Sequence, residues 1–162
     1  MAKKENKTNA MRVLDQNRIS YRIKTYECDE FIDGIHVADR NGDPYDQSFK
    51  TLVTVGKTGA YYVFVIPVDQ EIDLKKAARV VGEKSVEMLH VKDIHAVTGY
   101  IRGGCTPLGM KKRYPTVIQE SATAWDEIII SGGKLGVQIL LNPKDLAHVV
   151  DGSFADVIRV KN

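Results

Sequence analysis

The sequence predicts one α+β domain, residues 1–162, with a mixed, barrel-like β-sheet and flanking helices. Its 162 residues are a usual length for a single globular domain. Strand-like and helix-like segments alternate irregularly, which favours α+β over a doubly wound nucleotide-binding sheet. Two β-branched and aromatic runs, 49–55 and 60–66, flank a short segment bounded by Gly56 and Gly59, as expected of a β-hairpin.

The first part of the chain predicts a helix, a strand and a second, short helix. Thr8 or Asn9 can cap the first helix, and Asn17 suits the left-handed residue that ends it. Residues 19–26 alternate between apolar and polar side chains, as in a half-buried strand. A further helix is expected near residues 35–38.

Turn-forming residues over 39–44 predict a loop ahead of the hairpin. After the hairpin, Asp73 can cap a helix that Gly82 would end. The remaining predicted elements are a helix over 93–97, strands over 116–119, 127–131 and 136–141, and a final helix from Pro143 to Val149 that stops at Gly152.

Composition and charge exclude several classes of protein. A formal net charge of +2 is too small for a chain that coats duplex DNA, so no DNA partner is expected. No run of 18 apolar residues and no signal-peptide pattern occurs, so no membrane association is expected either. Cys28 and Cys105 lack CxxC spacing, which fits a reducing cytoplasm. Residues 1–7 are expected to form a flexible, solvated tail.

Two common kinds of site are disfavoured. Gly56-Lys57-Thr58 resembles the end of a phosphate-binding P-loop, but that motif requires a glycine at position 51, where Thr51 stands, and a following helix. His90 and His95 are five residues apart, so on a helix their side chains diverge. We therefore expect no metal and no cofactor.

A few residues could carry chemistry. The glycine pairs 103–104 and 132–133 would let backbone N–H groups converge on a developing oxyanion, although ordinary turns are the alternative. Lys50 opens an apolar strand, and because burying a lysine is costly, we expect its side chain to face a cleft. Cys105 has no assignable base beside it, so packing is favoured over a nucleophilic role. The cationic run 111–113 could hold phosphates.

Five short motifs follow one another in a fixed order. They are Ser48-Phe-Lys-Thr-Leu52, Leu74-Lys-Lys-Ala-Ala78, Thr98-Gly-Tyr100, Gly103-Gly-Cys-Thr-Pro-Leu-Gly109 and Ile130-Ser-Gly-Gly-Lys134. Together they resemble the YbaK/EbsC family of aminoacyl-tRNA deacylases, over a stretch that extends from the first helix to the last. The resemblance implies a free-standing editing hydrolase, related to the insertion domain of bacterial prolyl-tRNA synthetases, that cleaves the aminoacyl ester of mischarged tRNA. The segment Thr8–Leu14 is similar to the Cys-tRNA(Pro) deacylase group.

The resemblance also implies roles for individual residues. Lys50, Gly103 and Gly104 would act on the ester. The pocket would be lined by Tyr26, Phe49, Thr51, Thr106, Pro107, Ser131, Gly132 and Gly133. The candidates for tRNA contact are Lys111, Lys112 and Arg113. The expected partners are the acceptor end of mischarged tRNA and prolyl-tRNA synthetase.

Two other functions stay open on the sequence. A non-catalytic module could use the same cleft to bind tRNA or a synthetase, and a cysteine-dependent esterase would use Cys105. Within the editing function, no Ser-His or Cys-His nucleophile can be assigned, so either water or the substrate's own thiol attacks the ester. Editing is chemically necessary because a synthetase pocket for proline rejects smaller amino acids by only about 1–3 kcal/mol.

Overall fold

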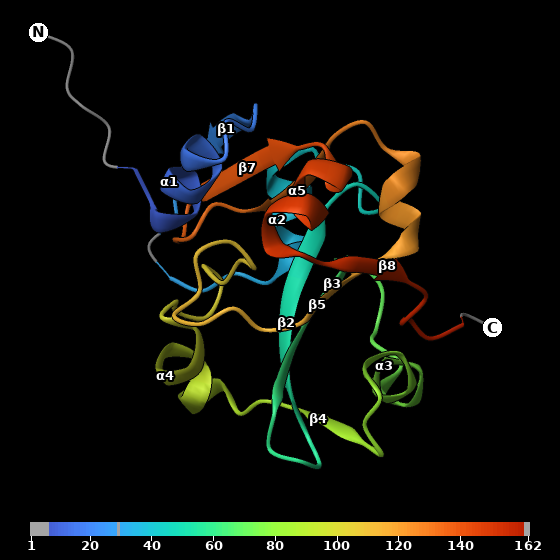
Figure 1. Cartoon of the computed structure of the whole chain (residues 1–162). Coiled ribbons are helices and arrows are strands. Elements are labelled where there is room, and N and C mark those ends of the chain that lie inside the picture. The colour runs from blue at the N-terminus through green and yellow to red at the C-terminus, as the bar shows by residue number, and fades with distance from the viewer. Residues whose placement is uncertain (1–6, 29, 161–162) are drawn as a thin grey trace, which may run out of the picture.

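The computed structural model describes residues 7–28 and 30–160, whose strands form two sheets (Figure 1). The smaller sheet has the order β1-β7-β6, with β1 (Arg22–Thr25), β6 (Ile128–Ser131) and β7 (Val137–Leu141). The larger sheet has the order β4-β2-β3-β5-β8, with β2 (Phe49–Gly56), β3 (Tyr61–Pro67), β4 (Val86–Met88), β5 (Thr116–Gln119) and β8 (Ser153–Ala155).

The larger sheet is mixed, which confirms that part of the prediction. β2 pairs antiparallel with β3 and β4, whereas β3–β5 and β5–β8 are parallel. An isolated parallel bridge between Ser48 and Ile129 joins β2 to β6 of the smaller sheet. The α+β class is thus confirmed, but the described strands form two open sheets linked at this bridge, so the expected barrel-like closure is not observed.

Helices cover the sheets and connect their strands. The α-helices are α1 (Asn9–Gln16), α2 (Gly34–Asn41), α3 (Leu74–Val81), α4 (Ile94–Thr98) and α5 (Pro143–Val150), and the 3₁₀ turns are η1 (Val91–Asp93) and η2 (Glu120–Ala124). Four of the α-helices begin at side chains that accept a backbone N–H, and these caps are Thr8, Asp33, Asp73 and Asn142. Local cap chemistry therefore sets where these helices start.

The predicted hairpin is formed by β2 and β3, which lie in the middle of the larger sheet. Its register runs from Phe49 opposite Pro67 to Val55 opposite Tyr61. Gly59 in the turn has a φ of +90°, which only glycine adopts without strain. Successive β3 side chains point to opposite faces, so Phe64 packs in the cluster with α3 while Val65 packs in the cluster with α1 and α5.

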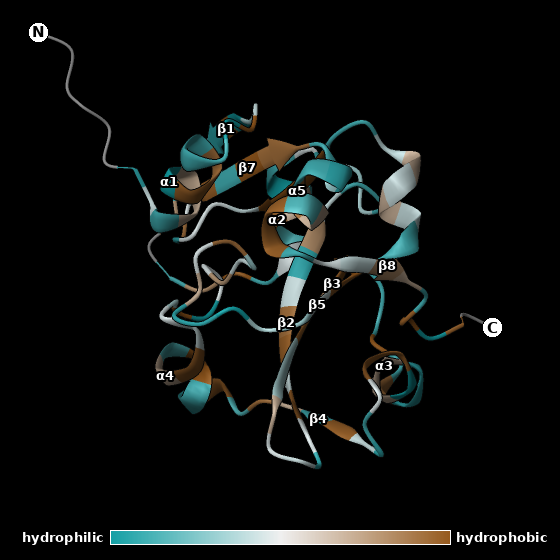
Figure 2. Cartoon of the chain, viewed as in Figure 1, coloured by the Kyte–Doolittle hydropathy of each residue, from teal (hydrophilic) through white to brown (hydrophobic). Residues whose placement is uncertain are grey.

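The core follows from this alternation. One cluster lies between the smaller sheet, α1 and α5, and contains Leu14, Ile139 and Leu146, all fully buried. The hydropathy colouring in Figure 2 shows brown along much of β7 and teal on outward turns of α1 and α5. The second cluster lies between the larger sheet and α3. None of the described helices is long and apolar enough to cross a bilayer.

Several expected element ends were wrong. Asn17 has a φ of −92°, and its neighbour Arg18 adopts the left-handed conformation instead, at +58°. The expected loop over 39–44 is helical up to Asn41, and Gly42 takes the left-handed position that ends α2. In α5, Asp151 takes this position, not Gly152.

Short elements were missed or overextended. The strand expected over 19–26 is limited to β1, where β7 offers partners. β4 and β8 have only three residues each, too few to show an alternating pattern, and were not predicted. Of the tail expected over 1–7, residues 1–6 lie outside the described residues, and Lys7 pairs with Asp15 at the end of α1.

Candidate active site

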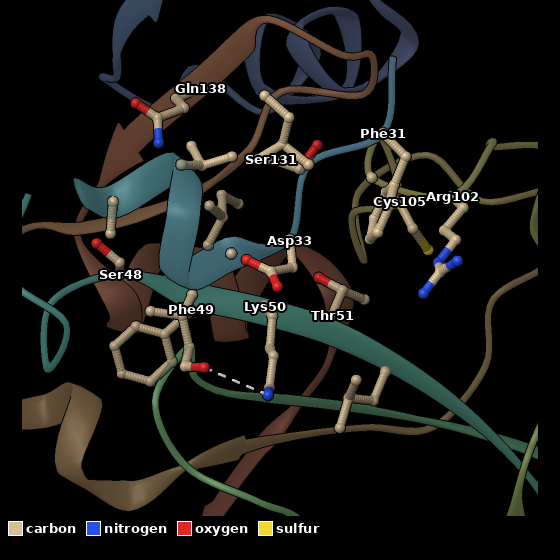
Figure 3. A pocket seen from close by; sticks show the side chains of 18 of the residues that line it. Phe31, Asp33, Ser48, Phe49, Lys50, Thr51, Arg102, Cys105, Ser131 and Gln138 are labelled. Carbon is tan, nitrogen blue, oxygen red and sulfur yellow. Dashed lines mark hydrogen bonds between the residues drawn. The ribbon is translucent and has the colours of Figure 1, made fainter. Parts of the chain in front are cut away.

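A cavity of about 370 Å³ lies where the two sheets meet (Figure 3). Its walls come from α2, from the start of β2, from β6 and β7, from the loop around Gly103, and from the segment between β4 and α4. This volume is within the range of small-molecule sites, roughly 300–1,000 Å³. The bridge between Ser48 and Ile129 holds the two sheets together at its edge, since Ser48 and Ile129 both line it.

Lys50 is the cation on the β2 wall. Its side chain is half-buried, and its Nζ donates a 3.4 Å hydrogen bond to the carbonyl oxygen of Val68 (Figure 3). Burial lowers the pKa of the Lys50 ammonium from its ordinary value of 10.5, an effect that the carboxylates of Glu71, Asp33 and Asp69 oppose. Within the described chain the ammonium makes only this one long hydrogen bond. It can therefore bind an oxygen atom of a ligand.

Thr51 follows Lys50 in β2 and lines the same cavity. Its hydroxyl oxygen is buried and has no hydrogen-bond partner among the described residues. Because a buried hydroxyl without a partner costs free energy, a bound ligand or water would satisfy it. In Figure 3 the Thr51 oxygen is turned toward the space beside Asp33.

The loop over 99–110 forms a third wall and is closed by its own polar side chains. Gly99, with a φ of +85°, ends α4, and the Thr98 hydroxyl accepts the N–H of Tyr100 at 3.0 Å. The Tyr100 hydroxyl donates to the carbonyl of Leu108 across the loop. Burial raises the pKa of Tyr100 to about 12, so this phenol remains a donor at neutral pH. The conspicuous Thr98-Gly99-Tyr100 motif thus shapes the loop.

Gly103 lies at the cavity end of this loop. Its φ is +84°, and a Cβ placed there would lie 2.7 Å from Leu135 Cδ2 and 3.0 Å from Phe31 Cδ2. Next to it, the Arg102 guanidinium carbon lies 3.9 Å from the centre of the Phe31 ring. Arg102 and Phe31 therefore form a stacked cation–aromatic pair on the rim of the cavity.

The structure brings six of the predicted site residues to this cavity. They are Tyr26, Phe49, Lys50, Thr51, Gly103 and Ser131. Phe49 is almost fully buried and also belongs to the core cluster, so it forms an apolar floor. Burial raises the pKa of the Tyr26 phenol, which stays protonated at neutral pH.

The remaining predicted glycines do not line the cavity, and their amides are engaged elsewhere. The N–H of Gly104 donates to the carbonyl of Ile101 at 3.0 Å, and that of Gly132 to Val137 at 2.8 Å. The N–H of Gly133 is 3.3 Å from the Ser131 hydroxyl. These three amides stabilise turns in this conformation, and of the four predicted glycines only Gly103 lines the cavity.

Five other predicted residues also lie outside the large cavity. Thr106 is fully buried, and Pro107 lines a second, smaller hollow of about 160 Å³ together with Lys112 and Arg113. Neither Thr106 nor Pro107 reaches the large cavity, because the loop turns away after Cys105. Lys111, Lys112 and Arg113 are exposed, which leaves them accessible to a polyanion.

Cys105 lines the cavity but is a poor nucleophile. Burial raises the pKa of the Cys105 thiol to about 11, so it is protonated at neutral pH.

The described residues contain no group of three or more His, Cys, Asp or Glu that could hold a metal ion.

Several polar or aromatic residues of the cavity were not predicted as site residues, among them Phe31, Asp33, Arg102 and Gln138. Asp33 was detectable as a helix cap, since it accepts the N–H of His36 at 2.9 Å. Gln138 was detectable as a polar residue within an otherwise apolar strand. Nothing local marks Phe31 and Arg102, because their pairing spans about seventy residues of chain.

Comparisons with known proteins agree with this architecture. A family model described as the aminoacyl-tRNA editing domain matches residues 35–149. The chain is 48% identical, over 97% of its own length and 98% of the relative's, to a protein of Enterococcus faecalis named "Putative Cys-tRNA(Pro)/Cys-tRNA(Cys) deacylase EbsC". The chain therefore belongs to the aminoacyl-tRNA editing domain family.

Two solved structures share the fold. One, described as "a putative trans-editing enzyme for prolyl tRNA synthetase", has a TM-score of 0.81 and 24% identity, and the match covers 96% of this chain and 100% of that chain. The other, a hypothetical protein, has a TM-score of 0.85 and 18% identity, with 93% and 99% covered. At these identities both matches establish the fold alone.

Proposed function

We propose that this protein hydrolyses the aminoacyl ester of mischarged tRNA, with Cys-tRNA(Pro) as its main substrate. The observation that carries the proposal is one cavity in which a half-buried lysine, Gly103 and Ser131 meet. The near full-length similarity to a protein named as a Cys-tRNA(Pro)/Cys-tRNA(Cys) deacylase supports the choice of substrate. The cytoplasm, where charged tRNA is found, is the proposed location.

The cavity provides positioning and electrostatic stabilisation. The Lys50 ammonium and the Gly103 backbone would hold the ester carbonyl and the terminal ribose while negative charge develops on the carbonyl oxygen. Thr51 contributes a hydroxyl that has no hydrogen-bond partner among the residues described. The exposed pair Arg102 and Phe31 offers a flat cationic surface on which the terminal base of the tRNA can stack.

The attacking group is water or the thiol of the bound cysteine. In either case the nucleophile adds to the ester carbonyl, the bond from the carbonyl carbon to the ribose oxygen breaks, and that oxygen takes up a proton. The Cys105 thiol is unsuited to attack because its raised pKa of about 11 keeps it protonated. Comparing Cys-tRNA with Ser-tRNA tests the choice, since equal turnover would argue against attack by the substrate thiol.

The decisive experiment incubates the purified protein with a panel of mischarged tRNAs and follows release of each amino acid. We expect fastest release from Cys-tRNA(Pro) and loss of release in Lys50→Ala. A protein that binds tRNA but releases no amino acid from any member of the panel would instead be a docking module.

A prolyl-tRNA synthetase partner is part of the proposal, because a net charge of +2 provides little affinity for tRNA by itself. Co-purification at low salt tests this, and complete absence of the synthetase from the captured material would contradict it. Recruitment by the synthetase would supply the discrimination among tRNAs that the small chain lacks.

A further inference from the structure

Gln138 is an unusual residue for its position. It lies in β7, whose sequence is Val-Gln-Ile-Leu-Leu, it is only 7% exposed, and it lines the cavity. It is the only polar residue of this strand. A polar side chain buried in such a strand needs hydrogen-bond partners.

Two partners, one at the end of α2 and one just after it, engage the Gln138 amide. Its Nε2 donates to Asp43 Oδ2 at 3.3 Å, and its Oε1 accepts from Asn41 Nδ2 at 3.2 Å. Asp43 is itself buried, at 8% exposed, and Lys24 Nζ donates to its other oxygen, Oδ1, at 2.6 Å. The carboxylate is therefore both neutralised and fixed in place.

This arrangement decides which way the amide faces. A carboxylate only accepts hydrogen bonds, so Asp43 requires the nitrogen of Gln138 and would repel its oxygen. With the nitrogen toward Asp43, the oxygen faces Asn41, whose amide nitrogen donates to it. This bond uses one N–H of Gln138, and the second N–H has no hydrogen-bond partner among the described residues.

The sheet places this amide toward the cavity. In the register of the smaller sheet, Gln138 stands opposite Lys24 on β1 and Ser131 on β6, and directly opposed residues share a face. Ser131 and Gln138 both line the cavity, whereas Lys24 and its acceptor Asp43 are not among the lining residues. Figure 3 shows the Gln138 nitrogen on the side of its amide turned toward the other lining residues.

We propose that Gln138 binds the aminoacyl group of the substrate as a hydrogen-bond donor, and that Asp43 is a positioning residue that keeps this donor facing the cavity. The inference rests on the proposed function and adds a contact to it. The bound group must present an acceptor, either the ester carbonyl or the heteroatom of the amino-acid side chain.

The first test compares Gln138→Met with wild type in single-turnover deacylation of Cys-tRNA(Pro). Methionine keeps the length of the side chain and removes the donor, and we expect kcat/KM to fall about tenfold, which corresponds to one hydrogen bond of about 1.4 kcal/mol. Gln16→Met, at the exposed end of α1, is the matched control and should leave the rate unchanged. A rate for Gln138→Met within twofold of wild type would overturn the inference.

The second test asks whether Asp43 acts through Gln138. Asp43→Asn keeps the shape but tolerates both orientations of the Gln138 amide, so kcat/KM should fall about threefold. In a Gln138→Met background the same change should have no further effect on kcat/KM, even if it still lowers Tm. Equal losses in both backgrounds would show a merely structural role and would contradict the assignment.

The same variants separate this inference from the proposed function. If wild type releases no amino acid from any mischarged tRNA, the proposed function fails. If wild type is active and Gln138→Met is equally active and folded, only the inference fails. Repeating the assay with Ala-tRNA(Pro) identifies the acceptor, since a loss shared by both substrates assigns the bond to the ester and a loss confined to cysteine assigns it to sulfur.

Discussion

The partly buried position of Lys50 disfavours the charged form of its side chain. Burial lowers its pKa from 10.5, so between the folded pKa and 10.5 the native state binds fewer protons than the unfolded chain. Stability therefore rises with pH in that window, and below it the full cost of burying the ammonium is present. At neutral pH Lys50 reduces the stability of the fold, which is typical of a residue retained for binding or catalysis.

This predicts opposite effects of one substitution on activity and stability. Lys50→Met should lower deacylation by roughly 100-fold or more, because the stabilising cation is lost. It should also raise Tm at pH 7, and the gain should shrink as the pH approaches 10. Thermal unfolding at several pH values and single-turnover assays measure both. A lower Tm at neutral pH would contradict the electrostatic argument.

Cys105 provides a residue-level test of the rival esterase function. Because its thiol is buried and protonated, Cys105→Ala should keep deacylation within about threefold of wild type, although the lost sulfur leaves a small gap in the cavity wall. Lys50→Ala measured in the same preparation series gives the reference for an inactive site. Abolished activity in folded Cys105→Ala would favour a cysteine nucleophile.

Among the elements, the loop over 99–110 shapes the site most directly. Its backbone is held by Thr98 and Tyr100 and by the bond from the N–H of Lys111 to the carbonyl of Thr98, at 3.0 Å. These contacts leave Gly103 in a left-handed conformation against Leu135 and Phe31. A side chain at this position meets both backbone strain and steric conflict.

Gly103→Ala separates these two effects when compared with Gly59→Ala. Both glycines have positive φ, +84° and +90°, so each substitution should cost about 1–2 kcal/mol of stability. Only Gly103 has neighbours within 4 Å of the added methyl group, whereas Gly59 has none. Deacylation should therefore fall at least about tenfold in Gly103→Ala and stay near wild type in Gly59→Ala. Equal activities in the two variants would show that Gly103 has no role at the cavity.

Elements whose ends depend on local chemistry could be predicted from the sequence. The helix from Leu74 to Val81 was predicted at both ends, because Asp73 accepts the first free amides and Gly82 accommodates the left-handed turn. β8 could not be predicted, since three residues gain their strand conformation from a parallel neighbour, β5, about thirty-five residues earlier in the chain. Pairing at that distance leaves no local pattern.

The same distinction applies to the site. Lys50 and Gly103 were predicted from motifs, and the cavity contains both. The Asn41, Asp43 and Gln138 network was not predicted, because β7 brings Gln138 beside residues about ninety-five positions away. The glycine pairs were predicted to lie in turns or at an oxyanion, and the sequence could not decide between the two. It does not show which backbone amides already have hydrogen-bond partners within their own turns.

For the whole molecule, the small net charge makes the distribution of cations decisive. Lys111, Lys112 and Arg113 are consecutive and exposed, on the same segment that lines the smaller hollow. If they bind tRNA phosphates, replacing all three by glutamine should raise KM about tenfold at low salt. The slope of log affinity against log salt should also decrease by about 2, as for two to three lost contacts.

The matched control removes the same charge elsewhere. Lys57, Lys75 and Lys84 are exposed and lie near α3 and the hairpin turn, so their replacement by glutamine alters net charge equally. Deacylation assays across a range of salt concentrations should show little change in KM for this variant. Similar effects of both triple variants would assign tRNA binding to overall charge and not to the 111–113 cluster.

The sheet order sets a limit on how this unit can be cut or transplanted. β1 and β8 both lie outside residues 35–149, yet they pair with β7 and β5 respectively. A fragment trimmed to that segment would leave two rows of backbone amides and carbonyls without partners, which readily recruit strands from neighbouring molecules. Grafting the editing activity into another polypeptide therefore requires carrying both outer strands along or shielding the edges they normally cover.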